Sequence, residues 1–138
     1  LVDVVLENAW TREEQCIKEE LKMLLEDPSL TVDLTAVRVP VFHGDGACVN
    51  LDFNKDVEIK EIANALMSHP KIVLHEHVED CPMPVDVAGN DGIHVGRLRH
   101  SDAGKNRVVL WMVFDGIRTA RVLTALEIAE NILRSKTV

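Results

Sequence analysis

The stretch from Thr35 to Phe53 constrains the fold of this chain more than any other. It begins with alternating residues rich in β-branched types, and Pro40 then interrupts the pattern. Residues 44–46, Gly-Asp-Gly, are typical of a tight turn, and alternation resumes from Ala47. This pattern predicts two strands joined by a short loop.

Arg38 lies inside the first of these predicted strands, among apolar neighbours. An unpaired guanidinium is costly to bury, so Arg38 is expected either to pair with a carboxylate or to point into a cleft that receives an anion. The sequence leaves both alternatives open.

Composition places the chain among globular proteins. It has 138 residues, 46% of them apolar, which is enough for the core of one domain, and we expect a single domain over residues 1–138. The net charge is -8, from 23 acidic and 15 basic residues, without a cluster of lysines or arginines, so nucleic acid is not an expected partner.

The sequence predicts a cytoplasmic protein. No apolar run reaches the roughly 18 residues that a membrane span needs, and residues 1–6 lack the features of a signal peptide. Cys16, Cys48 and Cys81 are an odd number without C-x-x-C spacing, so we expect free thiols.

Three helices are predicted. Thr11 and Glu14 form a capping box that starts a helix running to Glu26, where Asp27-Pro28 ends it. Asp56 is a candidate cap for a second helix over residues 57–67, and an amphipathic helix is expected over residues 117–133.

Further strands are expected over residues 71–78, 93–99 and 107–115, with a polar loop at residues 101–106. The order of elements predicts an α+β fold, with a mixed, largely antiparallel sheet and helices packed on one face.

His75 and His77 alternate on the predicted strand at residues 71–78. They could present two imidazoles to a metal, with Asp80 or Cys81 nearby, or they could be polar residues of an edge strand. We favour the second interpretation and expect no metal, because no further ligand pair has zinc spacing.

Several motifs together resemble the C-terminal substrate-binding and dimerisation domain of the aspartate-β-semialdehyde dehydrogenase family. They are Val-Arg-Val-Pro-Val-Phe at residues 37–42, Pro-Met-Pro at 82–84, Val-Gly-Arg-Leu-Arg at 95–99, residues 110–118, and Ile-Ala-Glu at 128–130. The resemblance covers about residues 10–132. It implies the C-terminal domain fold of glyceraldehyde-3-phosphate dehydrogenase and a homodimer formed through the sheet.

The resemblance also implies a reaction. Family enzymes reduce an acyl phosphate, β-aspartyl phosphate, to aspartate semialdehyde with NADPH through a cysteine thiolate, in amino-acid and lysine biosynthesis. This chain has no Gly-x-Gly-x-x-Gly motif, and none of its cysteines has the context of the nucleophile. We therefore expect the NADP-binding domain to be absent from this chain, and the chain alone to be inactive and to bind no NADP.

The resemblance assigns substrate recognition to this domain. Arg38 matches the arginine that grips the substrate carboxylate, and Glu13 matches the acidic residue that holds the amino group. Cys16 stands where the family has a phosphate-binding lysine, and Asp45 stands where it has the catalytic histidine, with His43 two residues earlier. An aspartate is a poor replacement for a histidine that exchanges protons near neutrality.

Three hypotheses therefore remain. The chain is part of a functional dehydrogenase, a non-catalytic dimerisation module with a degenerate site, or a fragment similar to N-acetyl-glutamyl-phosphate reductase. We expect self-association through the sheet, with Trp111, Met112 or Phe114 as anchors.

Overall fold

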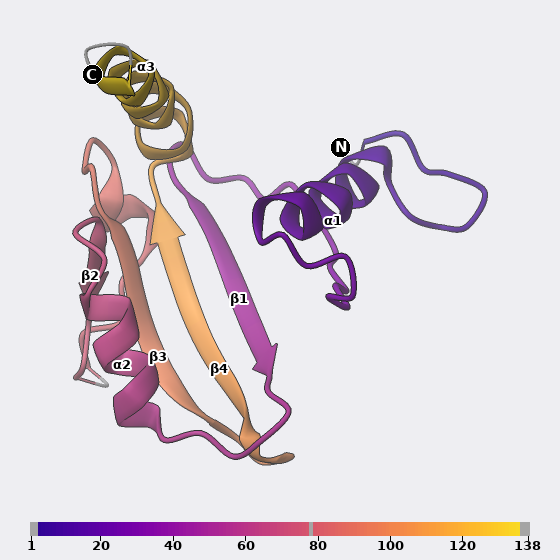
Figure 1. Cartoon of the computed structure of the whole chain (residues 1–138), viewed down its shortest axis with the longest axis vertical. Helices are drawn as coiled ribbons and strands as arrows, with labels where there is room; N and C mark the ends of the chain where they lie inside the picture. The colour runs from indigo at the N-terminus through magenta and orange to yellow at the C-terminus, as the bar shows by residue number, and fades with distance from the viewer. Residues whose placement is uncertain (1–2, 78, 136–138) are drawn as a thin grey trace. The chain divides into compact units, whose positions relative to one another are not determined.

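The computed structural model describes residues 3–77 and 79–135 of the chain. In chain order, the elements are α1 (Arg12–Leu24), β1 (Asp45–Asp52), α2 (Ile59–Met67), β2 (Ile72–Leu74), the 3₁₀ turn η1 (Pro84–Val87), β3 (Ile93–Ser101), β4 (Gly104–Phe114), the π-helix η2 (Gly116–Leu123) and α3 (Thr124–Ser135) (Figure 1). They belong to two compact units, Leu1–Pro40 and Val41–Val138. None of the described helices is long and apolar enough to cross a bilayer.

The first unit contains α1, and its start confirms the predicted capping box. The Thr11 hydroxyl accepts a hydrogen bond from the Glu14 amide at 3.1 Å, and the Glu14 carboxylate accepts one from the Thr11 amide at 2.8 Å. Two of the amides that a helix start leaves without partners are thereby satisfied. The helix ends at Leu24, close to the end predicted at Glu26.

The strand predicted before Pro40 is wrong. Residues 31–39 form no strand, although their β-branched composition favours one. A strand needs a neighbouring strand to receive its backbone hydrogen bonds, and here the amide of Ala36 donates to the carboxylate of Glu14 at 2.8 Å. The second strand of the predicted pair is confirmed as β1, but it already begins at Asp45, so the tight turn predicted at residues 44–46 is wrong.

The second unit contains a four-stranded sheet in the order β1-β4-β3-β2. β4 pairs antiparallel with β1 and β3, and β2 pairs parallel with β3, which confirms a mixed and largely antiparallel sheet. The predicted loop at residues 101–106 is shorter than expected, because Ser101 already pairs with Gly104 across a tight turn.

Helix α2 packs on one face of this sheet, over β2 and β3 (Figure 1). Leu74 lines the same cavity as Ile59 and Ala63 of α2, so α2 lies on the face to which Leu74 points. The strand register continues that face through Val95, Met112 and Ala47, while Cys48, Asn50 and Trp111 belong to the opposite face. Trp111 and Met112 therefore cannot anchor the same interface.

A close contact with Pro82 explains why residue 96 is a glycine. The ring of Pro82 packs over Gly96, where a Cβ would lie 2.7 Å from the Pro82 Cδ atom. The indole nitrogen of Trp111, opposite Gly96 in the sheet, donates to the carbonyl of Pro82 at 2.8 Å. The connector between β2 and β3 is thus fixed to the face opposite α2.

Other boundaries differ from the prediction. Helix α2 begins at Ile59 with Glu58 as its cap residue, so Asp56 is not the cap. β2 covers only Ile72–Leu74 of the strand predicted over residues 71–78, and Val78 lies outside the described residues. The helix predicted over residues 117–133 is a π-helix followed by α3, capped by Asp115.

Candidate functional site

Arg38 and Glu13, the two residues predicted to recognise a substrate, contact each other within the first unit. Arg38 Nη2 lies 2.9 Å from Glu13 Oε2 and 3.0 Å from Oε1. The Arg38 side chain is 64% exposed and that of Glu13 is 35% exposed. An ion pair so open to solvent contributes only about 0–1 kcal/mol to stability.

Glu14 holds this pair in place, a role that sequence analysis missed because it identified Glu14 only as a cap. Its Oε2 accepts from the Thr11 amide, and its Oε1 accepts from the Ala36 amide, two residues before Arg38. These backbone hydrogen bonds hold the pKa of the buried Glu14 carboxyl below its usual range. The sequence signal for this role was a carboxylate, Glu14, at the start of a helix, followed by a segment that can return to it, as residue Ala36 does.

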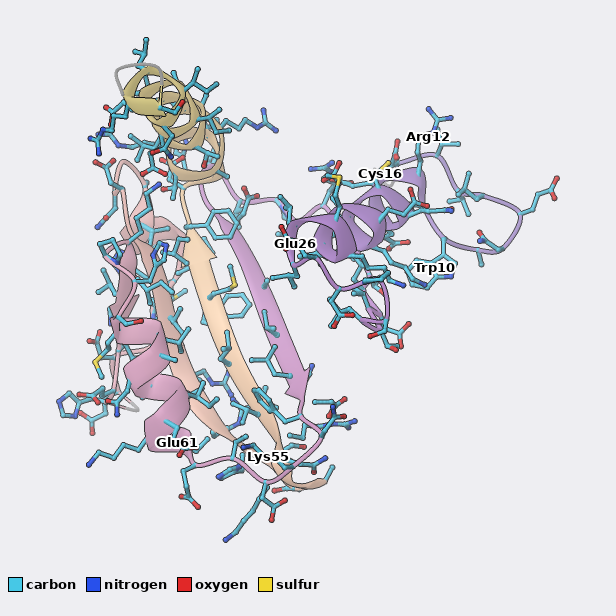
Figure 2. The ribbon with its side chains drawn as sticks, in the orientation of Figure 1. Trp10, Arg12, Cys16, Glu26, Lys55 and Glu61 are labelled. Carbon is cyan, nitrogen blue, oxygen red and sulfur yellow. The ribbon has the colours of Figure 1, made fainter. Side chains whose placement is uncertain are left out.

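Cys16 lies one helical turn after Glu13 on α1 and is exposed as a free thiol. Figure 2 shows Cys16 and Arg12 on one side of this helix and Trp10 on the other. A thiol at this position brings no positive charge to the neighbourhood of the Arg38–Glu13 pair.

Asp45 belongs to the second unit, where it is the first residue of β1 and pairs with Phe114 of β4. Its carboxylate lies directly against Gly116, because a Cβ built on Gly116 would meet Asp45 Oδ2. Asp45 is therefore placed at the passage from β4 into η2. The structure describes Asp45 and the Arg38–Glu13 pair in separate units.

His43 lies near Asp115 at the same end of the sheet. The Asp115 carboxylate accepts from the amides of Arg118 and Gly89, each at 2.9 Å, and of Ile117 at 3.1 Å. These backbone hydrogen bonds, assisted by the charge of His43, hold the pKa of Asp115 below its usual range. Asp115 is thus an ionised cap that ties the turn at Gly89 to the start of η2.

His75 and His77, which were predicted to alternate on a strand, both lie beyond the end of β2, so that part of the prediction is wrong. His75 follows the end of β2 and forms a hydrogen-bonded chain, with Nδ1 at 2.8 Å from Asp80 Oδ2 and Nε2 at 2.9 Å from His94 Nδ1. Burial, and then the neighbouring His75, lowers the pKa of His94. No set of three or more histidine, cysteine or acidic side chains among residues 3–77 and 79–135 is arranged to hold a metal ion.

The chain matches a known family over most of its length. Residues 2–119 match the family model described as "Semialdehyde dehydrogenase, dimerisation domain". A curated relative, an aspartate-semialdehyde dehydrogenase of Shewanella violacea, is 34% identical over 134 residues, which are 96% of this chain and 40% of the relative. A relative from Aquifex aeolicus with the same name is 28% identical over 135 residues, again 96% and 40% of the two chains.

Solved structures agree with this match. The structure of aspartate semialdehyde dehydrogenase II from Vibrio cholerae superposes with a TM-score of 0.91 at 31% identity, covering 97% of this chain and 40% of that one. The same enzyme has been solved in complex with ASA. A probable aspartate-semialdehyde dehydrogenase from Pseudomonas aeruginosa gives a TM-score of 0.89 at 29% identity, covering 96% and 40% of the two chains. The chain thus spans about 40% of the length of these relatives.

Proposed function

The chain belongs to the semialdehyde dehydrogenase dimerisation-domain family, and from this premise we propose that it is the substrate-recognition and dimerisation part of an NADP-dependent aspartate-semialdehyde dehydrogenase. The reaction is the reduction of β-aspartyl phosphate in amino-acid biosynthesis, including that of lysine, in the cytoplasm. The names of the relatives support the aspartate substrate over N-acetyl-glutamyl phosphate.

The observation that carries this proposal is the Arg38–Glu13 pair held by Glu14. An α-amino acid presents a carboxylate beside an ammonium group, and these charges are complementary to the guanidinium of Arg38 and the carboxylate of Glu13. Both bonds to Glu13 use Nη2, which leaves Nε and Nη1 of Arg38 to donate to the substrate carboxylate.

The described passage from β4 into η2 does not fit a bound dinucleotide. Such a cofactor sits on a glycine-rich turn between a strand and the N-terminus of a helix. Here the passage from β4 into η2 is filled by the Asp115 carboxylate, which occupies the amides of Ile117 and Arg118 and would repel a phosphate. NADP binding is therefore assigned to a nucleotide-binding domain outside this sequence.

A second candidate function is a dimerisation module without catalysis, and two positions favour it. Cys16 supplies no cation for a phosphate, and Asp45 or the nearby His43 must take the place of the family's catalytic histidine. Under the first function, Asp45 or His43 is the group that exchanges a proton with the substrate; under the second, neither is needed.

Dimerisation is proposed to use the sheet face opposite α2. On this face β1 exposes Cys48, Asn50 and Asp52, and β4 places Arg107 and the half-buried Trp111 beside them. Tryptophan and arginine are enriched at the energetically important positions of interfaces. A twofold arrangement is the commonest for soluble homo-oligomers.

Substrate recognition is tested by titrating the ¹⁵N-labelled chain with L-aspartate, which carries the carboxylate and ammonium of the substrate. Losing hydrogen bonds from a charged donor costs about 1.5–3 kcal/mol, so Arg38→Gln should weaken binding by about 10- to 100-fold. Arg134→Gln on α3 removes the same charge from the second unit and is the control. Equal affinity of the Arg38 and Arg134 variants would contradict the assignment.

Catalysis is tested in a fusion of this chain to the nucleotide-binding half of the Vibrio cholerae relative. NADPH oxidation with β-aspartyl phosphate supports the dehydrogenase. A fusion that dimerises and binds NADPH, yet remains inactive, supports the non-catalytic module.

The dimer is tested by sedimentation equilibrium of the 138-residue chain. A species of twice the 15.4 kDa chain mass is expected at micromolar concentration. Asn50→Arg, in the middle of the exposed face of β1, should give a monomer, whereas Asn64→Arg on the exposed side of α2 should not. A dimer that survives Asn50→Arg excludes this face.

A further inference from the structure

A cavity of about 350 Å³ lies in the second unit, between α2, the end of β2 and the middle of β3. Figure 1 shows these three elements side by side. The volume is within the range of small-molecule sites in proteins. The cavity shares no residue with the Arg38–Glu13 pair.

The sheet itself creates this cavity. β2 ends at Leu74, and the amide of His75 makes the last bond to β3, at the carbonyl of Val95. Immediately beyond this point β3 bulges, because Arg97 and Leu98 together oppose the single residue Leu110 of β4. A bulge bends its strand and redirects side chains, so the space beside β3 is left open.

Arg97 occupies this bulge with φ = 57°, in the left-handed region that residues other than glycine rarely adopt. Glycine would relieve the backbone strain, so the conformation alone does not explain an arginine there. Residues kept in such conformations are found preferentially at ligand sites.

The lining combines apolar side chains with two guanidinium groups. Ile59, Ala63, Leu74 and Leu98 are its apolar members, and Arg97 and Arg99 line it together with His75, His77 and one carboxylate, Glu76. In the described part of the chain, neither Arg97 nor Arg99 belongs to an ion pair, and Arg99 Nη1 donates only to the carbonyl of Arg97 at 2.9 Å.

Within the described residues, Arg97 and Arg99 thus place two guanidinium groups without a carboxylate partner beside a cavity that is partly apolar. We propose that this cavity binds a small organic carboxylate with an apolar body. The Arg97 and Arg99 guanidinium groups hold the carboxylate, and the body lies against Ile59 and Leu98. Planar guanidinium groups match the geometry of a carboxylate. Binding of the apolar body removes apolar surface of the lining from water, which is favourable.

The probe for this site is 4-phenylbutyrate, with the uncharged 4-phenylbutanamide as its isosteric control, titrated into the full chain by calorimetry. The carboxylate should bind at least about 10-fold more tightly than the amide, since each hydrogen bond to a charged group is worth roughly 1.5–3 kcal/mol. Equal binding of the two compounds, or no binding of either, overturns the proposal.

Three variants locate the site. Arg97→Gly fits the backbone at φ = 57° and removes a guanidinium, so it should keep the fold while weakening 4-phenylbutyrate by about 10-fold or more. Arg99→Gln should have a similar effect, and Ala63→Phe, which fills the cavity, should abolish binding. Arg134→Gln is the charge-matched control and should bind normally. Full affinity in the Arg97 or Ala63 variant places the probe elsewhere and overturns the assignment.

A rival occupant is the acidic surface of a second copy of the chain. Sedimentation of the Arg97→Gly and Arg99→Gln variants separates the two, because a ligand site leaves the oligomeric state unchanged. A change from dimer to monomer in both variants would assign the arginines to an interface and overturn the ligand proposal.

Discussion

Replacement of Gly96 by alanine tests how the β2–β3 connector is fixed to the sheet. The new methyl group would lie 2.7 Å from Pro82 Cδ and 3.4 Å from Pro82 Cγ. Both atoms belong to a rigid, buried ring, so the ring or the strand must move. Overpacking of this kind costs about 1–3 kcal/mol.

The magnitude converts into a measurable change in melting temperature. At about 2.1 cal/mol/K per residue, unfolding of the whole chain has an entropy of roughly 0.3 kcal/mol/K, so a loss of about 2 kcal/mol lowers the Tm by roughly 7 °C. Circular dichroism gives the Tm from thermal unfolding and the free energy of unfolding from urea unfolding.

The mechanism predicts two further results. In a Trp10→Phe background, fluorescence reports Trp111 alone, and Gly96→Ala should shift it to longer wavelength because the displaced Pro82 carbonyl no longer holds the indole nitrogen. Gly89→Ala is the control: φ is 76° and nothing lies within 4 Å of the added methyl, so stability falls through backbone strain while Trp111 emission is unchanged.

A double-mutant cycle with Pro82→Ala completes the test. Removing the ring makes room for the methyl group, so the two changes together should cost less than the sum of their separate effects by about 1 kcal/mol or more. Additive costs, or a Gly96→Ala cost below about 0.5 kcal/mol, would refute the proposed contact.

Three other predictions follow from the structure. Folding lowers the pKa of Glu14, so its carboxylate stabilises the fold above the pKa that Glu14 has in the unfolded chain, and this contribution is lost as pH falls through the folded pKa. In acid titrations followed by circular dichroism, the free energy of unfolding of Glu14→Gln should therefore change less with pH between these two pKa values than that of the original chain. In the fusion with a nucleotide-binding half, the paired changes Asp45→His and Cys16→Lys should raise NADPH oxidation by roughly 10²-fold or more if the site is otherwise intact, and an unchanged rate would contradict that. All three cysteines are exposed in the single chain. The rate at which a thiol reagent modifies Cys48 should therefore fall as protein concentration rises and the proposed dimer forms, while the rates at Cys16 and Cys81 stay the same. An unchanged Cys48 rate at every concentration would argue against the sheet face opposite α2 as the interface.

Local physical chemistry made part of this structure predictable. The capping box of Thr11 and Glu14 depends on residues three apart, so the sequence alone places the start of α1. β4 was predictable because its run of β-branched and apolar residues fits a strand in the middle of a sheet. The motifs at residues 82–84 and 95–99 identified the family, although they gave no reason for Gly96, which lies under Pro82.

Tertiary structure decided what local preference could not. Residues 31–39 have the composition of a strand, yet they form none, because a strand exists only where a neighbour accepts its hydrogen bonds and the Ala36 amide is taken by Glu14. That same bond brings Arg38 to Glu13 across 25 residues of chain, so the candidate substrate pair is a product of the fold. The cavity beside Arg97 likewise depends on where β2 stops and β3 bulges, and both are set by strand pairing between segments far apart in sequence.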